Sequence, residues 1–73
     1  MLTMPIQQVA DVLHRSVKTA RRLNSAGLLP EPMRLNGRLL WRQSDIELWV
    51  ELGMPPRKEF NQLKNTRRRL QKT

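Results

Sequence analysis

The chain has 73 residues, room for one small domain, and its 14 Lys and Arg residues against 6 Asp and Glu give a formal net charge of +8. It has no Cys and one His, so disulfides, thiolate metal sites and Cys nucleophiles are excluded, and His14 lacks companion ligands for zinc. No apolar run approaches the ~18 residues of a membrane span and no signal-peptide core follows the N-terminus, so we expect a soluble intracellular protein with a negatively charged partner.

The first predicted element is a short helix near Pro5, a residue suited to the first helical turn because it has no N–H to leave unpaired. Thr3 or Met4 is the expected N-cap. Apolar residues at helical spacing give the helix one buried stripe and indicate about two turns. These residues are Ile6, Val9, Ala10 and Leu13.

A second helix is predicted from Val17 to about Ala26, with Ser16 as its N-cap and Gly27 in the left-handed conformation that ends it. His14 falls in the turn between the two helices, where we expect it to tolerate an unusual backbone conformation. Two short helices joined by a tight turn form a helix-turn-helix candidate. The side of the second helix opposite its apolar side is polar and basic, and carries Lys18, Arg21, Arg22 and Ser25.

A Pro-punctuated connection follows, and then Asn36-Gly37 between two apolar-containing runs predicts a β-hairpin, because a type I′ turn needs positive φ at both positions. A two-stranded hairpin is marginal by itself, so its apolar residues are expected to pack on the helices while its tip projects outward. In this register the facing pairs are Leu35 with Arg38, Arg34 with Leu39, and Met33 with Leu40.

A third helix is predicted from the capping box formed by Ser44 and Glu47, and a glycine and two prolines end it. Glu47 and Glu51 are expected on its exposed side. We interpret Trp41 and Trp49 as core residues rather than as platforms for nucleic-acid bases. The expected buried stripe of this helix comprises Ile46, Trp49, Val50 and Leu52.

These elements divide the chain into a domain of residues 1–53 and a basic extension of residues 54–73. The extension contains seven basic side chains and one acidic one, as many as residues 15–42. Phe60, Leu63 and Leu70 have helical spacing, so residues 57–71 could form an amphipathic helix. Because an isolated helix of this length is marginal in water, we favour a tail that is partly helical or disordered when free and ordered on DNA or on a neighbouring subunit.

The sequence offers no Gly-rich phosphate loop, no pair of inward carboxylates and no nucleophile–base pair. We therefore expect no enzyme, no catalytic residue, no metal and no cofactor. Two basic segments separated by a short acidic one indicate a nucleic acid as the partner rather than solubility alone.

Several short motifs in residues 2–53 resemble the AlpA/excisionase group of small prophage regulators, within the MerR-like winged-helix class. The motifs are Leu2-Thr3, Val9-Ala10, Leu13, Ser16-Val17-Lys18-Thr19, Arg22, Gly27-x-Leu29-Pro30, Arg34-Leu35-Asn36-Gly37-Arg38 and Trp41-Arg42-x-Ser44-Asp45-Ile46-x-x-Trp49. The run from Gly27 to Trp49 is the specific part. His14 stands where the group commonly has Gly, and Ala20 replaces a larger apolar residue.

The resemblance implies a mainly α fold with a small β-hairpin, a winged helix-turn-helix of three short helices and a wing, followed here by the basic extension. It implies a protein that binds repeated sites in attachment DNA, bends that DNA and directs an integrase toward excision. The alternative is a transcription regulator of prophage or mobile-element genes. The implied partners are double-stranded DNA, an integrase or recombinase, and neighbouring copies of the chain, with no membrane and no small-molecule substrate. The implied location is the bacterial cytoplasm, in association with the nucleoid. The implied protein is encoded by a bacterium or a phage.

The expected DNA contacts form three groups. The second helix, expected in the major groove with Arg22 reading a guanine edge, offers Arg15, Ser16, Lys18, Thr19, Arg21, Arg22 and Ser25. The wing, expected in the adjacent minor groove, offers Arg34, Asn36, Gly37, Arg38 and Arg42. The tail, expected to add non-specific contact with DNA or a partner, offers Arg57, Lys58, Lys64, Arg67, Arg68 and Arg69.

Two further classes stay open on the sequence. One is an RNA-binding basic protein, although the chain has few aromatic residues for base stacking and no recognisable RNA motif. The other is an adaptor whose working part is the tail, which would contact protein through Phe60, Leu63 and Leu70.

Overall fold

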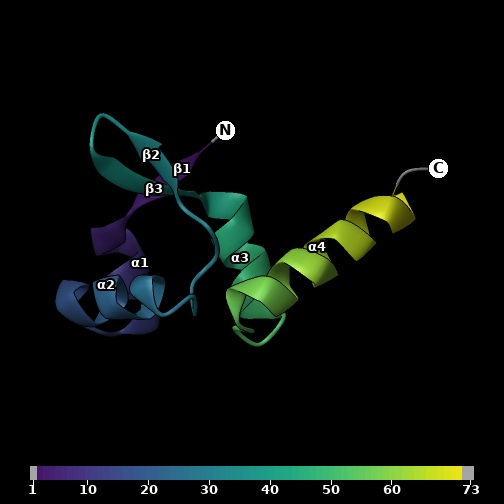
Figure 1. Ribbon diagram of the computed structural model, residues 1–73, viewed down its shortest axis with the longest axis horizontal. Coiled ribbons are helices and arrows are strands. Elements are labelled where there is room, and N and C mark those ends of the chain that lie inside the picture. Colours follow the sequence, from purple (N-terminus) through teal and green to yellow (C-terminus); the bar gives the residue numbers. More distant parts are fainter. Residues whose placement is uncertain (1, 72–73) are drawn as a thin grey trace.

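The computed structural model describes residues 2–71, with side chains up to Arg67, and within them it has four helices and a three-stranded sheet (Figure 1). This mainly helical arrangement with a small antiparallel sheet is the predicted winged helix-turn-helix, with one strand and one helix more than expected. In chain order the elements are β1 (Thr3–Pro5), α1 (Ile6–Leu13), α2 (Val17–Ser25), β2 (Met33–Leu35), β3 (Arg38–Arg42), α3 (Gln43–Glu51) and α4 (Arg57–Gln71).

The hairpin of β2 and β3 has the predicted register. Asn36 and Gly37 at its tip have φ angles of 50° and 77°, the positive values that a type I′ turn requires. The hairpin therefore closes through a two-residue turn and projects from the sheet as a short wing. The facing residues are Met33 with Leu40, Arg34 with Leu39, and Leu35 with Arg38.

β1, which the sequence analysis missed, pairs antiparallel with β3 and gives the sheet the order β1-β3-β2. Its central residue Met4 lies opposite Trp41 and is 9% exposed. The expectation that Thr3 or Met4 caps α1 is wrong: both lie in the strand, and Pro5 is the N-cap, without a side-chain hydrogen bond. Proline is tolerated in β1 because this is an edge strand. By pairing with β3, β1 anchors the wing on the rest of the domain.

α3 starts one residue before the predicted capping box. The helix begins at Gln43 with Arg42 as N-cap and no side-chain cap hydrogen bond, so the predicted box of Ser44 and Glu47 is wrong. Because β3 runs directly into α3, Ser44 lies inside the first turn instead of before it. Glu47 Oε1 instead accepts a hydrogen bond of 2.9 Å from Gln43 Nε2.

The buried stripe of α3 is narrower than predicted. Ile46 and Trp49 are 1% and 2% exposed, and Leu48 is half-buried against the core. Val50 and Leu52, which were expected in the stripe, are exposed instead. Val50 is 38% exposed, and Leu52 lies beyond the last helical residue.

One hydrophobic core joins the helices and the sheet, and both Trp residues belong to it, as predicted. The indole N–H of Trp41 donates a hydrogen bond of 2.7 Å to the carbonyl oxygen of Pro30, and that of Trp49 donates one of 2.8 Å to the carbonyl oxygen of Pro55. Each Trp therefore fills the core and also fixes a Pro-containing connection to it. The largest fully buried apolar side chains besides Trp41 are Phe60, Leu29, Ile46 and Val9.

α4 begins inside this core, so the favoured expectation of a partly ordered tail is corrected for its first two turns. Phe60 is 1% exposed, and Arg57 and Lys64 on either side of it bond to the domain. Tertiary contacts of this kind stabilise a helix that would be marginal alone. Further along, α4 projects away from the other elements and gives the molecule a long axis of 40 Å (Figure 1). The side chain of Leu70 lies outside the described part. Among residues 2–71 no helix has the length and apolar character to cross a bilayer.

Candidate nucleic-acid interface

The turn between α1 and α2 depends on His14, which has the left-handed conformation, with a φ of 56°. Its backbone N–H donates to the carbonyl oxygen of Asp11 at 3.1 Å, and the N–H of Arg15 donates to that of Ala10 at 3.0 Å. These bonds satisfy carbonyl groups at the end of α1 and reverse the chain within three residues. The expectation that His14 tolerates an unusual backbone here is confirmed.

Ser16 caps α2, as predicted. Its Oγ accepts a hydrogen bond of 3.1 Å from the N–H of Thr19 and donates one of 3.0 Å to Thr19 Oγ1. Two of the three hydroxyl groups expected to contact DNA, those of Ser16 and Thr19, are therefore part of the helix cap. A substitution at either residue would alter the start of the recognition helix together with any DNA contact.

α2 presents one side to the domain and the other to solvent. Ala20 is fully buried, and Val17 and Leu23 on the same side are half-buried. The opposite side spans about a quarter of the helix circumference at 100° per residue and is exposed. Three of its four side chains are positively charged and none is negative. They are Lys18, Arg21, Arg22 and Ser25.

The tip of the wing is the second exposed basic element. Leu35 is 60% exposed there, so the tip is also partly apolar. The other residues at the tip are all exposed, and two of them are arginines: Arg34, Asn36, Gly37 and Arg38. These four are the wing contacts predicted from the sequence, apart from Arg42.

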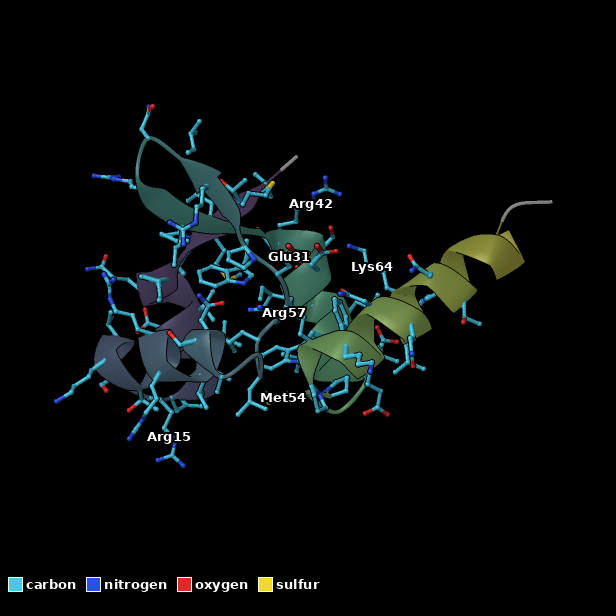
Figure 2. All side chains as sticks on the ribbon, in the orientation of Figure 1. Arg15, Glu31, Arg42, Met54, Arg57 and Lys64 are labelled. Atoms are coloured by element: carbon cyan, nitrogen blue, oxygen red, sulfur yellow. The ribbon has the colours of Figure 1, made fainter. Side chains whose placement is uncertain are left out.

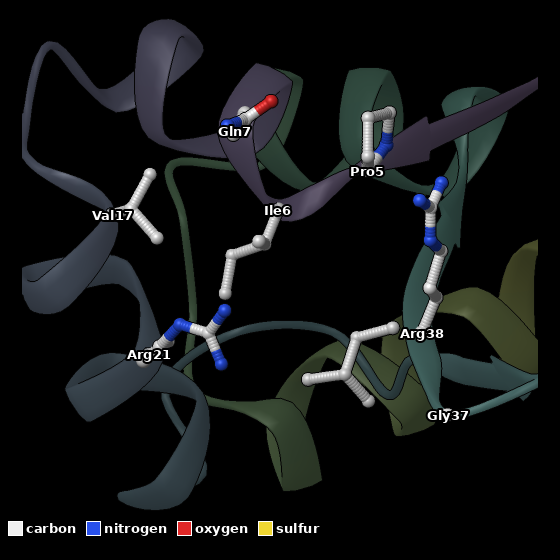
Figure 3. Close-up of a pocket in the computed structure, with 8 residues that line it drawn as sticks. Pro5, Ile6, Gln7, Val17, Arg21, Gly37 and Arg38 are labelled. Carbon is white, nitrogen blue, oxygen red and sulfur yellow. The ribbon is translucent and has the colours of Figure 1, made fainter.

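A hollow of about 320 Å³ separates α2 from the wing. Figure 3 shows Arg21 of α2 and Arg38 of β3 bordering it from two sides, with Ile6 and Gln7 of α1 between them. Gln7 was not among the predicted contacts. The only signal for it in the sequence is its place on the polar side of the first helix. The hollow thus has positive charge on both flanks, with Arg21 on the side of α2 and Arg38 on the side of the wing.

Arg15 and Arg42 lie apart from this hollow. Arg15 is exposed in the turn before α2, and Figure 2 shows it on the side of α2 away from the wing. Arg42 is half-buried at the other end of β3 from the wing tip. Arg42 lines a second hollow of about 300 Å³ together with Glu31, Asp45 and Lys64. Two of these four side chains are basic and two are acidic, and Figure 2 labels Arg42, Glu31 and Lys64.

The basic residues of α4 are partly committed to contacts inside the protein. Arg57 donates hydrogen bonds to the carbonyl oxygens of Leu29 and Asn24, and Lys64 forms an ion pair of 3.1 Å with Asp45. Two others are exposed: Lys58, and Arg67, which lies 4.0 Å from Glu51. The side chains of Arg68 and Arg69 lie outside the described part.

The sequence pattern of a known family, described as a helix-turn-helix domain, matches residues 4–51, from β1 to the last residue of α3. Neither the curated proteins nor the solved structures gave a match to the chain. The matched residues include the capped helix α2 and the wing, and exclude all of α4. In helix-turn-helix proteins of known DNA complexes, the second helix of the motif lies in the major groove of double-stranded DNA. The chain therefore belongs to the helix-turn-helix domain family of the AlpA/excisionase type, whose members bind DNA in a sequence-specific manner.

Proposed function

We propose that the protein inserts α2 into the major groove of its DNA site and the wing into the adjacent minor groove. The observation that carries this proposal is the hollow between α2 and the wing, with Arg21 and Arg38 on its two flanks. A sugar–phosphate strand separates the two grooves, and it would occupy this hollow with an arginine on either side. Arginine suits this position because its guanidinium group binds phosphate oxygens in a bidentate manner.

Within the major groove, Arg22 is the proposed reader of a guanine edge. It is exposed near the middle of the basic side of α2, next to Lys18 one turn earlier. Arginine is the side chain that most often bonds the O6 and N7 atoms of guanine. Arg34, Asn36 and Arg38 would follow the width of the minor groove rather than its base identity.

We further propose that the protein is an excisionase that binds and bends attachment-site DNA and so directs an integrase toward excision. Its resemblance to the AlpA/excisionase type supports this role. The proposed entry of the wing into the minor groove would fit it as well, because elements that enter this groove commonly deform the duplex. A transcription regulator of prophage or mobile-element genes is the second candidate, since it would use the same surface.

The DNA-reading proposal is tested with random-sequence duplexes, from which the wild-type protein selects its preferred site. Arg22→Ala should then weaken binding to the selected duplex by about 1–3 kcal/mol and relax the preference at a single base pair. Arg67→Ala, which removes an exposed arginine from α4, is the control and should leave that preference unchanged. Equal weakening of all sequences by Arg22→Ala would contradict the assignment. Tighter binding to a folded RNA than to the selected duplex would favour the RNA-binding class instead.

The two biological roles are separated by a second pair of measurements. A circular-permutation gel shift on the selected site measures bending, and a recombination assay with an integrase and attachment sites that contain the selected sequence measures excision. An excisionase should bend the site and raise the yield of excision. Unchanged excision together with altered expression of a promoter that carries the site would favour the transcription regulator.

A further inference from the structure

The recognition helix is held at its C-terminal end by a side chain from α4. Arg57 Nε donates a hydrogen bond of 2.9 Å to the carbonyl oxygen of Leu29. Its Nη2 donates to two oxygens of Asn24, the carbonyl oxygen at 3.2 Å and Oδ1 at 2.8 Å. The backbone N–H of Arg57 also donates to the carbonyl oxygen of Gly27 at 3.0 Å. One residue of α4, which is labelled in Figure 2, thus bonds to three residues at and after the end of α2.

These acceptors make Arg57 a specific partner and not a general positive charge. Asn24 lies in the last turn of α2, where carbonyl groups carry partial negative charge, and its carbonyl oxygen accepts from the N–H of Gly27 as well as from Arg57. A planar guanidinium group reaches several such oxygens at once, and a lysine ammonium group cannot reproduce that geometry. The arrangement therefore requires arginine at this position.

The C-terminal end of α2 has other restraints besides Arg57. The N–H groups of Gly27 and Leu28 donate to its last carbonyl groups, and Leu29 is fully buried. The N-terminus of α2 is fixed by the Ser16 cap, and its middle by Ala20, which is buried against α1. Near its C-terminus Leu23 is only half-buried, and the chain leaves the helix through Gly27 with a φ of 74°. Arg57 is itself held because Phe60, one turn later in α4, is buried in the core. Arg57 is the contact by which α4 adds to these restraints, so the direction of the exposed basic side of α2 depends in part on α4.

We propose that Arg57 is a positioning residue for DNA recognition: it fixes the end of α2 through Asn24 and Leu29, and so sets the angle at which α2 enters the major groove. This inference rests on the DNA-reading role proposed for α2. It gives α4 a part in recognition although α4 lies outside the residues that match the family. It also separates Arg57 from the basic residues of α4 that would act through their charge alone.

The test compares variants at two adjacent arginine and lysine positions. Arg57→Gln removes the charge and the hydrogen bonds, Arg57→Lys keeps the charge, and Lys58→Gln removes one charge from an exposed residue that makes no hydrogen bond or ion pair within the described part. Dissociation constants are measured for the selected duplex and for a scrambled duplex. Both Arg57 variants should bind the selected duplex about tenfold more weakly, and Lys58→Gln should not. On the scrambled duplex Arg57→Gln and Lys58→Gln should match within about twofold, because each loses one charge.

A measurement without DNA keeps the proposal falsifiable where a variant is destabilised. The amides of Gly27 and Leu28, which donate to the carbonyl oxygens of Asn24 and Leu23, report on the end of α2 by hydrogen exchange. They should exchange faster in Arg57→Lys than in wild type, while core amides such as that of Trp41 remain protected. Uniformly faster exchange would mean general unfolding and would overturn the positioning role.

Two further outcomes are decisive. If Arg57→Gln and Lys58→Gln weaken both duplexes equally and Arg57→Lys binds like wild type, Arg57 is a phosphate contact and the proposal is overturned. If the wild-type protein selects no sequence, the DNA-reading function fails, and the exchange data still decide whether Arg57 fixes α2. Faster exchange confined to the end of α2 would support that part, and unchanged exchange would overturn it.

Discussion

α2 and α4 are both basic helices, and they use their positive charge in opposite ways. The three basic side chains of α2 are all exposed, on the side away from the domain. α4 is the more basic of the two by sequence, yet Arg57 and Lys64 bond to a helix end and to a carboxylate within the protein. The number of charges therefore does not tell which helix is available to DNA. The partners that surround each charge do.

The two helices also differ in how they are held. α2 rests on the domain through a small residue, Ala20, and α4 through a large one, Phe60. A side chain of that size stabilises the fold far more when buried than a methyl group does. We infer that α4 carries more of the stability and α2 more of the recognition.

The largest effect expected from this comparison of α4 with α2 is the loss of stability in Phe60→Ala. Removing the buried ring should lower the free energy of unfolding by about 3–5 kcal/mol, because it leaves a cavity in a small core. Leu63→Ala, at a position 38% exposed in the same helix, should cost less than about 1 kcal/mol. Urea denaturation measures both. Losses of similar size would mean that α4 is not part of the core.

The salt dependence of DNA binding sharpens the contrast from the side of recognition. Neutralising Arg21 and Arg38 together should reduce the slope of log K against log salt by about 0.9 for each lost phosphate contact, even on a duplex of about one helical turn. Neutralising Arg67 should reduce it only on a longer duplex, because the later part of α4 projects away from α2 and the wing (Figure 1). Equal reductions on the short duplex would show that both helices contact the same stretch of DNA.

A smaller effect is expected for the ion pair that joins α4 to α3. Asp45→Asn removes the partner of Lys64, at a site where both side chains are largely buried, and should cost about 1 kcal/mol of stability. Glu51→Gln, on the same helix, loses a pair that is exposed and 4.0 Å long and should cost almost nothing. Thermal unfolding at low and at high salt distinguishes them. A loss for Glu51→Gln as large as that for Asp45→Asn would contradict this order.

The smallest expected change is a gain in stability at the entrances to the two helices. His14 before α2 and Met54 before α4 both have positive φ angles, of 56° and 59°, which an L-residue adopts at a cost. His14→Gly and Met54→Gly should each add about 0.5 kcal/mol and raise Tm by about 2–4 °C. A fall in Tm at either position would mean that its side chain makes a contact worth more than the strain.

Local chemistry explains what could be predicted from the sequence. Asn36-Gly37 defines the hairpin register because few other residue pairs accept two positive φ angles. Ser16 limits α2 at its N-terminus through its side-chain cap, and Gly27 follows its C-terminus with a positive φ angle. The interpretation of both Trp residues as core was correct because a domain this small needs large side chains to fill its interior.

What was missed depends on partners far apart in the chain. β1 has three residues, one of them proline, so it shows no alternation, and its partner β3 lies more than thirty residues later. The role of Arg57 has no sequence signature, because two of its side-chain acceptors are backbone carbonyl oxygens that every residue possesses. The prediction of a capping box at the N-terminus of α3 was wrong, because Ser44 has the right spacing from Glu47 but lies inside the helix. The contacts of the basic side chains with DNA stay predictions.

Because both Trp residues are buried, the intrinsic fluorescence of the protein reports on its core. The chain has two Trp and no Tyr, so its intrinsic fluorescence comes from Trp41 and Trp49 alone. Both are screened from water in the core, and their emission should lie at short wavelength and shift to longer wavelength only when the core opens. Unfolding can therefore be followed without a label. DNA docking on α2 and the wing would leave this signal nearly unchanged, and a dye attached through an introduced cysteine at an exposed position outside the proposed contacts would be needed to follow it.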